Sequence, residues 1–531
     1  MKNTIDIAKV STRGTAALSL GLIVSNVVMA AGTLLVASFL SEAEYGLYAI
    51  VLTVPALFSL FQDLGVNSAI IKYTAQYRAE NRREEIKKIL VTGLIFDAIL
   101  GFCLSLIAFF SASFLAVTVV CRPEIKSLIE IASVVILFSS MITAVQSVFI
   151  GFERMKFNSL TMIFQSVLKC FASPALVLIG YGVYGAIMGA IVASAATTVL
   201  GIVIFLFSFY RKLEMKIDNF QRKFKESLSV LIRYGFPISV STIASGFQTQ
   251  FYNFLVYRAE PSNVSIANYQ MATNFMVLLG FLTTPITTVL FPAFSKLNIE
   301  QDGESLRRIF QLSVKYSSLI VTPAATALMV LSGPFVGTLF VEKFNVAPFY
   351  LSLLAIQGLF VGIGNLSINN LINSQGKTTV TLKLTLLTFS VGVSLSLLLI
   401  PFFRIIGLIV TVLIAGIPSL IIGFWWIRKH FNASIDVVSS AKIYLSSGIA
   451  GALTYYIVIN LSSLPFWIGL VAGGTFIALF YMVSVSLTHA IDKNDVSNLR
   501  EMLREIGPAL KIINPILKIV EKISVKQKIN Q

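Results

Sequence analysis

Long apolar runs alternate with short polar segments along the whole chain. About 20 apolar residues are needed for a helix to cross roughly 30 Å of hydrocarbon. Because no ten-residue alternation typical of membrane barrels occurs, we expect the runs to be helices. The runs long enough to span a membrane are residues 15–40, 46–70, 89–115, 128–150, 159–180, 182–209, 229–257, 266–294, 309–332, 347–373, 379–401, 405–427, 441–460 and 465–489.

Lysine and arginine are distributed unequally between alternate loops. Of the 41 in the chain, 35 fall in the two termini and the loops on one side, and five fall in the loops on the other side. Lys169 is the basic residue that lies deepest within a span. Basic loops stay in the cytoplasm of multi-pass proteins. We therefore expect a multi-pass protein of the cell membrane with both termini cytoplasmic.

The composition excludes several other classes. Of the 531 residues, 56% are hydrophobic and only 12% are charged, which a soluble domain does not accommodate. The net charge of +16 lies mostly between spans, so it indicates topology and we expect no nucleic-acid partner. Three cysteines without paired spacing, two histidines at the ends of apolar runs and the lack of a Walker motif predict neither a metal site nor a cofactor.

The chain contains an internal repeat with an offset of about 220 residues. Glu80 aligns with Glu300, and Arg13 aligns with Arg233. Each half holds six expected spans, an even number, so the halves enter the membrane from the same side as a parallel pseudo-twofold repeat. We expect an all-α membrane protein with an N-terminal lobe at 1–215, a C-terminal lobe at 216–430, spans 13 and 14 at 431–490 and a cytoplasmic basic amphipathic tail at 491–531.

Short motifs follow one another in a fixed order between these spans. They are Arg13-Gly14, Tyr45-Gly46-Leu47-Tyr48, Asp63-Leu64-Gly65, Tyr73, the charged loop from Glu80 to Lys88, Gly151-Phe152 and Arg233-Tyr234-Gly235-Phe236-Pro237. With this order and with six, six and two spans, the chain resembles the O-antigen-type polysaccharide-biosynthesis flippases of the multidrug/oligosaccharidyl-lipid/polysaccharide exporter superfamily.

The resemblance implies a MATE-like fold and a transport function. Two lobes would rock about a central cavity and move a lipid-linked oligosaccharide from the inner to the outer leaflet. The partners implied are membrane lipid, a polyprenyl-linked glycan substrate and glycan-assembly enzymes.

Four basic residues are candidates for binding the phosphates of such a substrate. Arg13 and Arg233 are related by the repeat and begin the first helix of each lobe, Lys72 ends the second span, and Lys169 lies within the fifth. Arginine suits phosphate because its planar fork holds two oxygens at once. The alternative interpretation of Arg13, Arg233 and Lys72 is that they anchor helix ends at lipid headgroups.

Asp97 is the acidic candidate. It lies about 12 Å from the cytoplasmic side and Lys169 about 16 Å, at 1.5 Å per residue. Ionisable residues at such depth mark ion pathways or pair with each other. Asp97 is therefore expected either to hold a proton or sodium ion for coupling or to form a structural ion pair with Lys169.

Amide side chains also fall within spans, where they face protein or water. They either bind sugar hydroxyls or bond neighbouring helices. The candidates are Gln248, Asn253 and Asn274.

Two other functions are alternatives to transport of a lipid-linked glycan. A cation-coupled multidrug or small-solute exporter of the same superfamily would be expected to carry an acid in the first span, and residues 15–40 contain none. A membrane glycosyltransferase or polymerase would need a sizeable outer loop, and outer loops such as 116–127 are short. We therefore expect a transporter and not an enzyme, without catalytic residues.

Overall fold

The computed structural model describes residues 2–212, 220–297, 299–461, 463–491 and 495. Of the tail expected at 491–531, only Ile491 and Asp495 are therefore described. The described chain is nearly all helical, and no strand occurs in these ranges. The α-helices are α1 (Lys2–Phe39), α2 (Glu42–Ser59), α3 (Val66–Ala79), α4 (Arg83–Phe114), α5 (Lys126–Ala132), α6 (Val134–Gly151), α7 (Met155–Leu176), α8 (Gly182–Ser208), α9 (Phe220–Ala259), α10 (Asn263–Ser295), α11 (Ile299–Val330), α12 (Ser332–Phe340), α13 (Ala347–Ala355), α14 (Asn365–Ser374), α15 (Thr378–Ala415), α16 (Ile417–Phe431), α17 (Val437–Asn460) and α18 (Phe466–Leu487).

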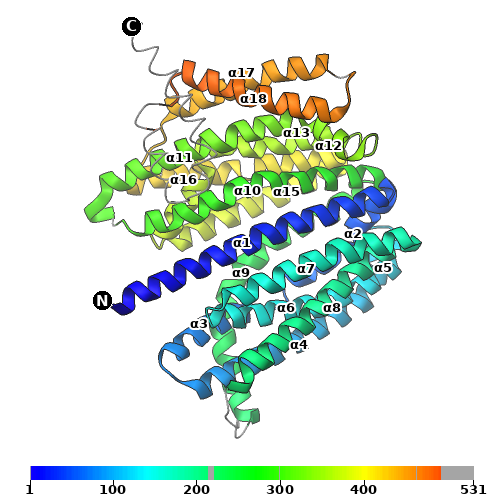
Figure 1. The fold of residues 1–531 in the computed structure, drawn as a ribbon, viewed down its shortest axis with the longest axis vertical. Helices are drawn as coiled ribbons and strands as arrows, with labels where there is room; N and C mark the ends of the chain where they lie inside the picture. Colours follow the sequence, from blue (N-terminus) through cyan, green and yellow to red (C-terminus); the bar gives the residue numbers. More distant parts are fainter. Residues whose placement is uncertain (1, 213–219, 298, 462, 492–494, 496–531) are drawn as a thin grey trace. The chain divides into compact units, whose positions relative to one another are not determined.

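Many of these helices are long and apolar enough to cross a membrane. Eight helical stretches of the described chain meet that condition, or up to ten if each of two bent helix pairs is one span. One stretch, Met155–Ser208, contains both α7 and α8, which pack side by side (Figure 1). The expectation of a multi-pass helical membrane protein is confirmed, whereas the count of fourteen spans stays a prediction.

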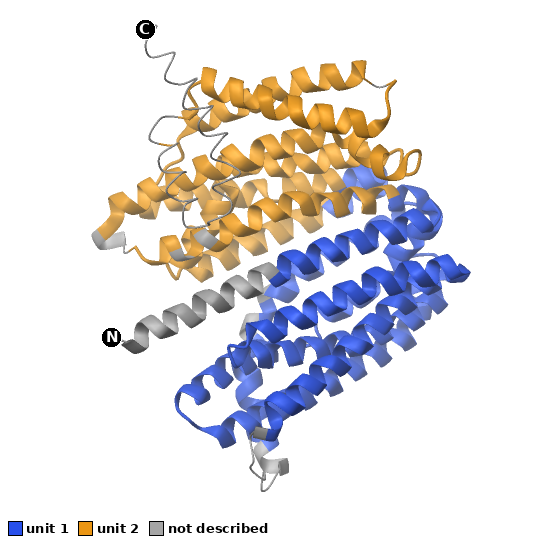
Figure 2. Ribbon diagram, in the orientation of Figure 1, with its two compact units in different colours: residues 1–267, 396–408 blue, residues 268–395, 409–531 orange. Residues whose placement is uncertain are grey.

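The chain forms two compact units (Figure 2). Unit 1 comprises residues 1–267 and 396–408, and unit 2 comprises 268–395 and 409–531. In unit 1, α1 packs along α7, and α9 packs on α2, α3 and α4. In unit 2, α11 contacts α13 and α17, and α17 packs on α18. By its contacts α9 lies with unit 1, while the repeat assigns it to the C-terminal lobe. The lobe boundary at 215 therefore stays a prediction.

The second expected span, 46–70, is two helices and not one. Residues 60–65 between α2 and α3 are non-helical. In this break, the Asp63 carboxylate accepts hydrogen bonds from the Gly65 N–H at 2.6 Å and from the Asn67 side-chain amide at 3.0 Å. An aspartate bonded to the backbone two residues on stabilises a turn, and Gly65, with φ of 81°, takes a conformation that costs glycine little.

The break packs directly against the backbone of α9. A Cβ atom on Gly65 would lie 2.0 Å from the carbonyl oxygen of Gly235, and one on Gly235 would lie 2.3 Å from the carbonyl oxygen of Gly65. Neither atom in the way is the end of a flexible side chain. Two glycines are therefore required for α3 and α9 to approach this closely.

The far end of α9 is held by the loop between α4 and α5. The buried Arg122 guanidinium donates hydrogen bonds to the carbonyl oxygens of Tyr257 and Glu260, each at 2.6 Å. The last carbonyl groups of a helix lack partners within the helix, and a cation there also complements the helix dipole. Unit 1 thus holds α9 at two places about 33 Å apart along the helix, at 1.5 Å per residue.

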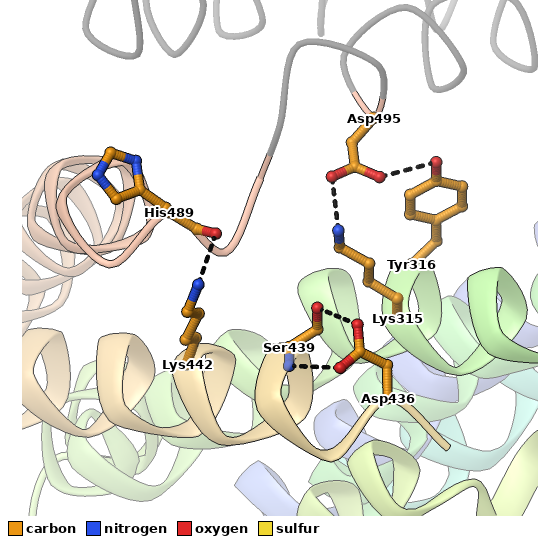
Figure 3. Close-up of polar contacts among 7 residues, drawn as sticks. All are labelled: Lys315, Tyr316, Asp436, Ser439, Lys442, His489 and Asp495. Carbon is orange, nitrogen blue, oxygen red and sulfur yellow. Dashed lines mark hydrogen bonds and ion pairs between the residues drawn. The ribbon is translucent and has the colours of Figure 1, made fainter. Parts of the chain in front are cut away.

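In unit 2, the chain beyond α18 is tied back to two helices (Figure 3). Asp495 accepts hydrogen bonds from the Lys315 ammonium at 2.6 Å and from the Tyr316 hydroxyl at 3.1 Å, both on α11. Both charged side chains are largely buried. Lys442 on α17 donates to the His489 carbonyl oxygen at 3.3 Å. These bonds fix the end of α18 to the body of the unit.

Adding one methyl group at Gly235 tests how closely the break between α2 and α3 packs against α9. We expect Gly235→Ala to lower the free energy of unfolding by about 1–3 kcal/mol, because the added Cβ forces two backbones apart. Thermal unfolding of the purified protein in detergent, followed by circular dichroism, measures the change. Gly280→Ala is the matched control, since nothing lies within 4 Å of a Cβ at that helical position. Equal melting temperatures for the two variants would contradict the packing described here.

Candidate functional site

Two of the cations predicted from the sequence lie where α3 meets α9. The Lys72 ammonium on α3 lies 3.9 Å from the centroid of the Tyr234 ring on α9 and 4.9 Å from that of Tyr73. The two rings meet edge to face, with centroids 5.7 Å apart. Tyr234 directly follows Arg233, and the side chains of Lys72 and Arg233 are both exposed. The structure therefore brings Lys72 to the turn of α9 that carries Arg233.

These four residues, Lys72, Tyr73, Arg233 and Tyr234, are called the Lys72 site below. A cation over an aromatic face is held electrostatically by the ring. The ammonium has three N–H donors and the guanidinium five, and neither group accepts a hydrogen bond. An exposed pair of this kind suits an anion with several oxygens, such as a phosphate.

A second group of polar side chains lies near the start of α3, where Asn67 is about 8 Å from Lys72 along the helix. Asp97 on α4 is fully buried, and neither carboxylate oxygen has a hydrogen-bond partner in the described part of the chain. The side-chain oxygen of the buried Asn67 is likewise without a partner there.

Ser140 on α6 links Asp97 to the break in the second span. Its hydroxyl donates to the Asp97 carbonyl oxygen at 2.7 Å and lies 3.4 Å from the carbonyl oxygen of Gln62, the residue before Asp63. The backbone of α4 at Asp97, the broken span and α6 are therefore packed together. Asp97, Asp63 and Asn67 are called the Asp97 site below.

The structural ion pair between Asp97 and Lys169, one of the two alternatives, is wrong. Lys169 on α7 lines a cavity of about 10 Å³ together with Thr33, Tyr48 and Ser173, on the side of α1 and α2. It forms no ion pair with any acidic residue that the structure describes. Such a cavity has room for about one water molecule and is too small for a phosphate group.

The predicted amides bond to neighbours on their own helices. Gln248 and Asn253 lie on α9 in unit 1, and Asn274 lies on α10 in unit 2. The bonds are Gln248 to the Tyr252 hydroxyl at 2.6 Å, Asn253 to the Gln250 side-chain oxygen at 3.4 Å, and Gln270 to the Asn274 side-chain oxygen at 3.2 Å. Their role in binding sugar stays a prediction. The side chain of Arg13 lies outside the described residues.

Unit 2 contains a larger polar cavity of about 200 Å³. Its walls come from α14, α15 and α16, and the Thr388 and Ser419 hydroxyls within it lie 2.5 Å apart. Ligand pockets for drug-sized molecules are usually about 300–1,000 Å³, so this cavity suits one small polar group. The polar residues lining it are Asn365, Asn369, Thr385, Thr388 and Ser419.

Sequence reasoning missed four residues of these two sites. Tyr73 and Tyr234 belong to the motifs of the resemblance but were given no binding role. Asp63 lies within the expected span 46–70, so the criterion that selected Asp97, an ionisable side chain inside a span, selects it as well. Asn67 lies in the same span and meets the criterion that selected the other amides.

Comparison with known proteins places the chain among membrane proteins of polysaccharide synthesis. Residues 11–298 match the family described as polysaccharide biosynthesis protein. The lipopolysaccharide biosynthesis protein WzxC of Escherichia coli is 28% identical over 355 residues, which cover 65% of this chain and 66% of WzxC. The stage V sporulation protein B of Bacillus subtilis is 24% identical over 501 residues, covering 87% and 92%.

Two solved structures share the fold. The lipid II flippase MurJ in an inward closed conformation aligns with a TM-score of 0.71 at 16% identity, covering 88% of this chain and 98% of that one. An inward-facing MATE multidrug transporter of the MOP superfamily aligns with a TM-score of 0.61 at 20% identity, covering 79% and 98%. At these identities the likeness concerns the fold alone, and it agrees with the expected MATE-like architecture.

The family match covers more than half of the chain, from the first helix through α10. It includes both the Lys72 site and the Asp97 site. The chain belongs to the polysaccharide biosynthesis protein family.

Proposed function

We propose that this protein moves a polyprenyl-phosphate-linked oligosaccharide precursor from the inner to the outer leaflet of the cell membrane by alternating access. Three comparisons support the proposal. The family is one of polysaccharide biosynthesis, WzxC is named for lipopolysaccharide biosynthesis, and MurJ, which shares the fold, is named a lipid II flippase.

The observation that carries the proposal is the exposed pair of cations in the Lys72 site. A lipid-linked glycan presents phosphate oxygens at the membrane surface between its tail and its sugars. In our proposal the Lys72 ammonium and the Arg233 guanidinium bind these oxygens on the cytoplasmic side, and the tyrosine rings keep the ammonium in place. The polar headgroup then crosses within the protein while the tail stays in lipid.

The proposed orientation follows from the charges of the loops. Both termini and the basic loops lie in the cytoplasm, and the loop that carries Arg122 lies outside. Substrate would then be supplied by glycan-assembly enzymes on the cytoplasmic side. The chain itself transports and does not catalyse.

Removing either cation tests the site. We expect Lys72→Met and Arg233→Gln each to slow transbilayer movement of a fluorescent polyprenyl-pyrophosphate oligosaccharide in vesicles by about 10–100-fold, because a hydrogen bond to a charged group contributes about 1.5–3 kcal/mol. Lys429→Met is the matched control, since Lys429 also lies over a ring, that of Trp425, at 5.0 Å. Its rate is expected to stay at the native value.

Two results of this experiment would count against the proposal. If Lys72→Met moves the lipid as fast as the native chain, the cation holds α3 to α9 and does not bind phosphate. If the native chain leaves the lipid in place but exports a cationic dye along an ion gradient, the cation-coupled exporter is the better function.

The orientation is tested with the chain's own cysteines. In a Cys103→Ser, Cys170→Ser background, we expect a membrane-impermeant maleimide to label the exposed Cys121 in intact cells, because its loop lies outside. After the further changes Cys121→Ser and His430→Cys, labelling is expected only once the membrane is permeabilised. The reverse pattern would overturn the orientation.

A further inference from the structure

The cavity of about 200 Å³ in unit 2 has polar walls that carry no charge. Among the residues that the structure describes, neither an acidic nor a basic side chain lines it. A charged ligand would leave water there without a countercharge, which costs far more free energy than the transfer of a neutral polar molecule. The cavity therefore suits an uncharged ligand.

Two rows of polar side chains lead to this cavity from neighbouring helices. They are Asn365, Asn369 and Asn373 on α14, and Thr381, Thr385 and Thr388 on α15. Residues three or four apart lie on one face of a helix. The Thr381 hydroxyl donates a hydrogen bond to the Asn373 side-chain oxygen at 2.7 Å. The two rows therefore face each other at the end where residues 375–377 join the helices.

Further from this bond, the rows are separated by the cavity. Asn365, Asn369 and Thr385 line it, and none of these side chains forms a hydrogen bond with a residue that the structure describes. Both asparagines are exposed, so the cavity is open on the side of α14. An amide has two donors and an acceptor, and a hydroxyl donates and accepts. The open part of the cavity thus offers donors and acceptors next to each other.

The opposite wall is already bonded and fixed. The Ser419 hydroxyl on α16 donates to the Leu384 carbonyl oxygen at 2.8 Å and lies 2.5 Å from the Thr388 hydroxyl. These bonds hold α16 against α15 beside the cavity. A ligand would therefore meet one fixed wall and, on α14, amides that are free to bind it.

A single sugar ring meets these requirements. Its hydroxyl groups both donate and accept hydrogen bonds, as the amides and hydroxyls of the walls do. Its ring C–H groups are apolar, and Ile368, Leu384 and Leu420 supply apolar lining. Sites for drug-sized molecules are usually about 300–1,000 Å³, so a cavity of this size takes one ring and not a chain of rings.

We propose that this cavity binds one uncharged monosaccharide unit, through Asn365, Asn369 and Thr385. That the sugar belongs to the transported glycan rests on the proposed function, whereas binding of the sugar itself does not. Within the expected span 347–373, Asn369 lies about 6 Å and Asn365 about 12 Å from the end assigned to the cytoplasm, at 1.5 Å per residue. The sugar would thus be bound on the side from which substrate is supplied.

Binding of free monosaccharides to the full chain in detergent tests the inference. Saturation-transfer difference NMR is recorded with D-glucose, D-galactose, D-mannose and N-acetyl-D-glucosamine at equal concentration. We expect the native chain to give signals with at least one of these four sugars. D-glucuronic acid is expected to give none, because its carboxylate would enter a cavity without a countercharge.

Gly416 allows the cavity to be filled without removing a polar contact. Gly416 lines the cavity, and a Cβ atom on it would have nothing within 4 Å. We expect Gly416→Leu to fold like the native chain and to lose the sugar signals. Gly448→Leu is the matched control, because a Cβ at that exposed position of α17 also has nothing within 4 Å and Gly448 does not line the cavity. It is expected to keep the native signals.

Asn369→Leu removes an amide and keeps a branched side chain of similar shape. We expect the dissociation constant of the sugar to rise about 3–10-fold, as for the loss of one hydrogen bond between neutral groups. Asn370→Leu is the control on the same helix, since the Asn370 amide donates to the Leu366 carbonyl oxygen at 2.7 Å and does not line the cavity. Its dissociation constant is expected to equal that of the native chain.

Three results would overturn the inference. The first is the absence of signals from all four neutral sugars with the native chain. The second is native sugar signals in Gly416→Leu. The third is equally strong signals from D-glucuronic acid, which would show that the site does not select an uncharged ring.

The transport proposal can fail separately. If Gly416→Leu abolishes sugar binding but the native chain moves no lipid-linked glycan in vesicles, only the transport proposal fails. If the native chain moves that lipid, Gly416→Leu moves it equally fast and no sugar binds, only the present inference fails.

Discussion

The approach of Gly65 to Gly235 is the contact on which the arrangement of unit 1 depends. It brings the backbones of the broken second span and α9 together without side chains between them. Beside this contact, the Tyr234 ring lies 3.9 Å from the Lys72 ammonium. Arg122 holds the same helix at its other end. A helix that the repeat assigns to one half of the chain is thereby attached at two points to the other.

The length of the apolar runs is enough to predict much of the architecture. Apolar length predicts membrane helices because hydrocarbon satisfies no backbone group, and the structure confirms a multi-pass helical protein. The break at Asp63 was not predicted, since the run 46–70 stays apolar through it and only the Asp-Leu-Gly turn chemistry reveals it. The sequence also does not predict which helices pack against each other. The depths of Asp97 and Lys169 agree, but depth says nothing about direction around a helix, and the two residues lie on α4 and α7 with different neighbours. Lys72 lies over the ring of Tyr234, the residue that follows Arg233. The positions of charged residues in the sequence do not predict this contact.

The bond between Asp495 and Lys315 has a practical consequence for handling the protein. A chain cut after His489 would leave the Lys315 ammonium largely buried without its carboxylate. Breaking a buried pair by removing one partner typically costs about 3–5 kcal/mol. Affinity tags, fluorescent fusions and shortened versions intended for crystallisation therefore need to keep Asp495, which lies eight residues beyond the end of α18 at Leu487. The folded part of unit 2 therefore includes this carboxylate, which lies beyond the end of the hydrophobic helix α18.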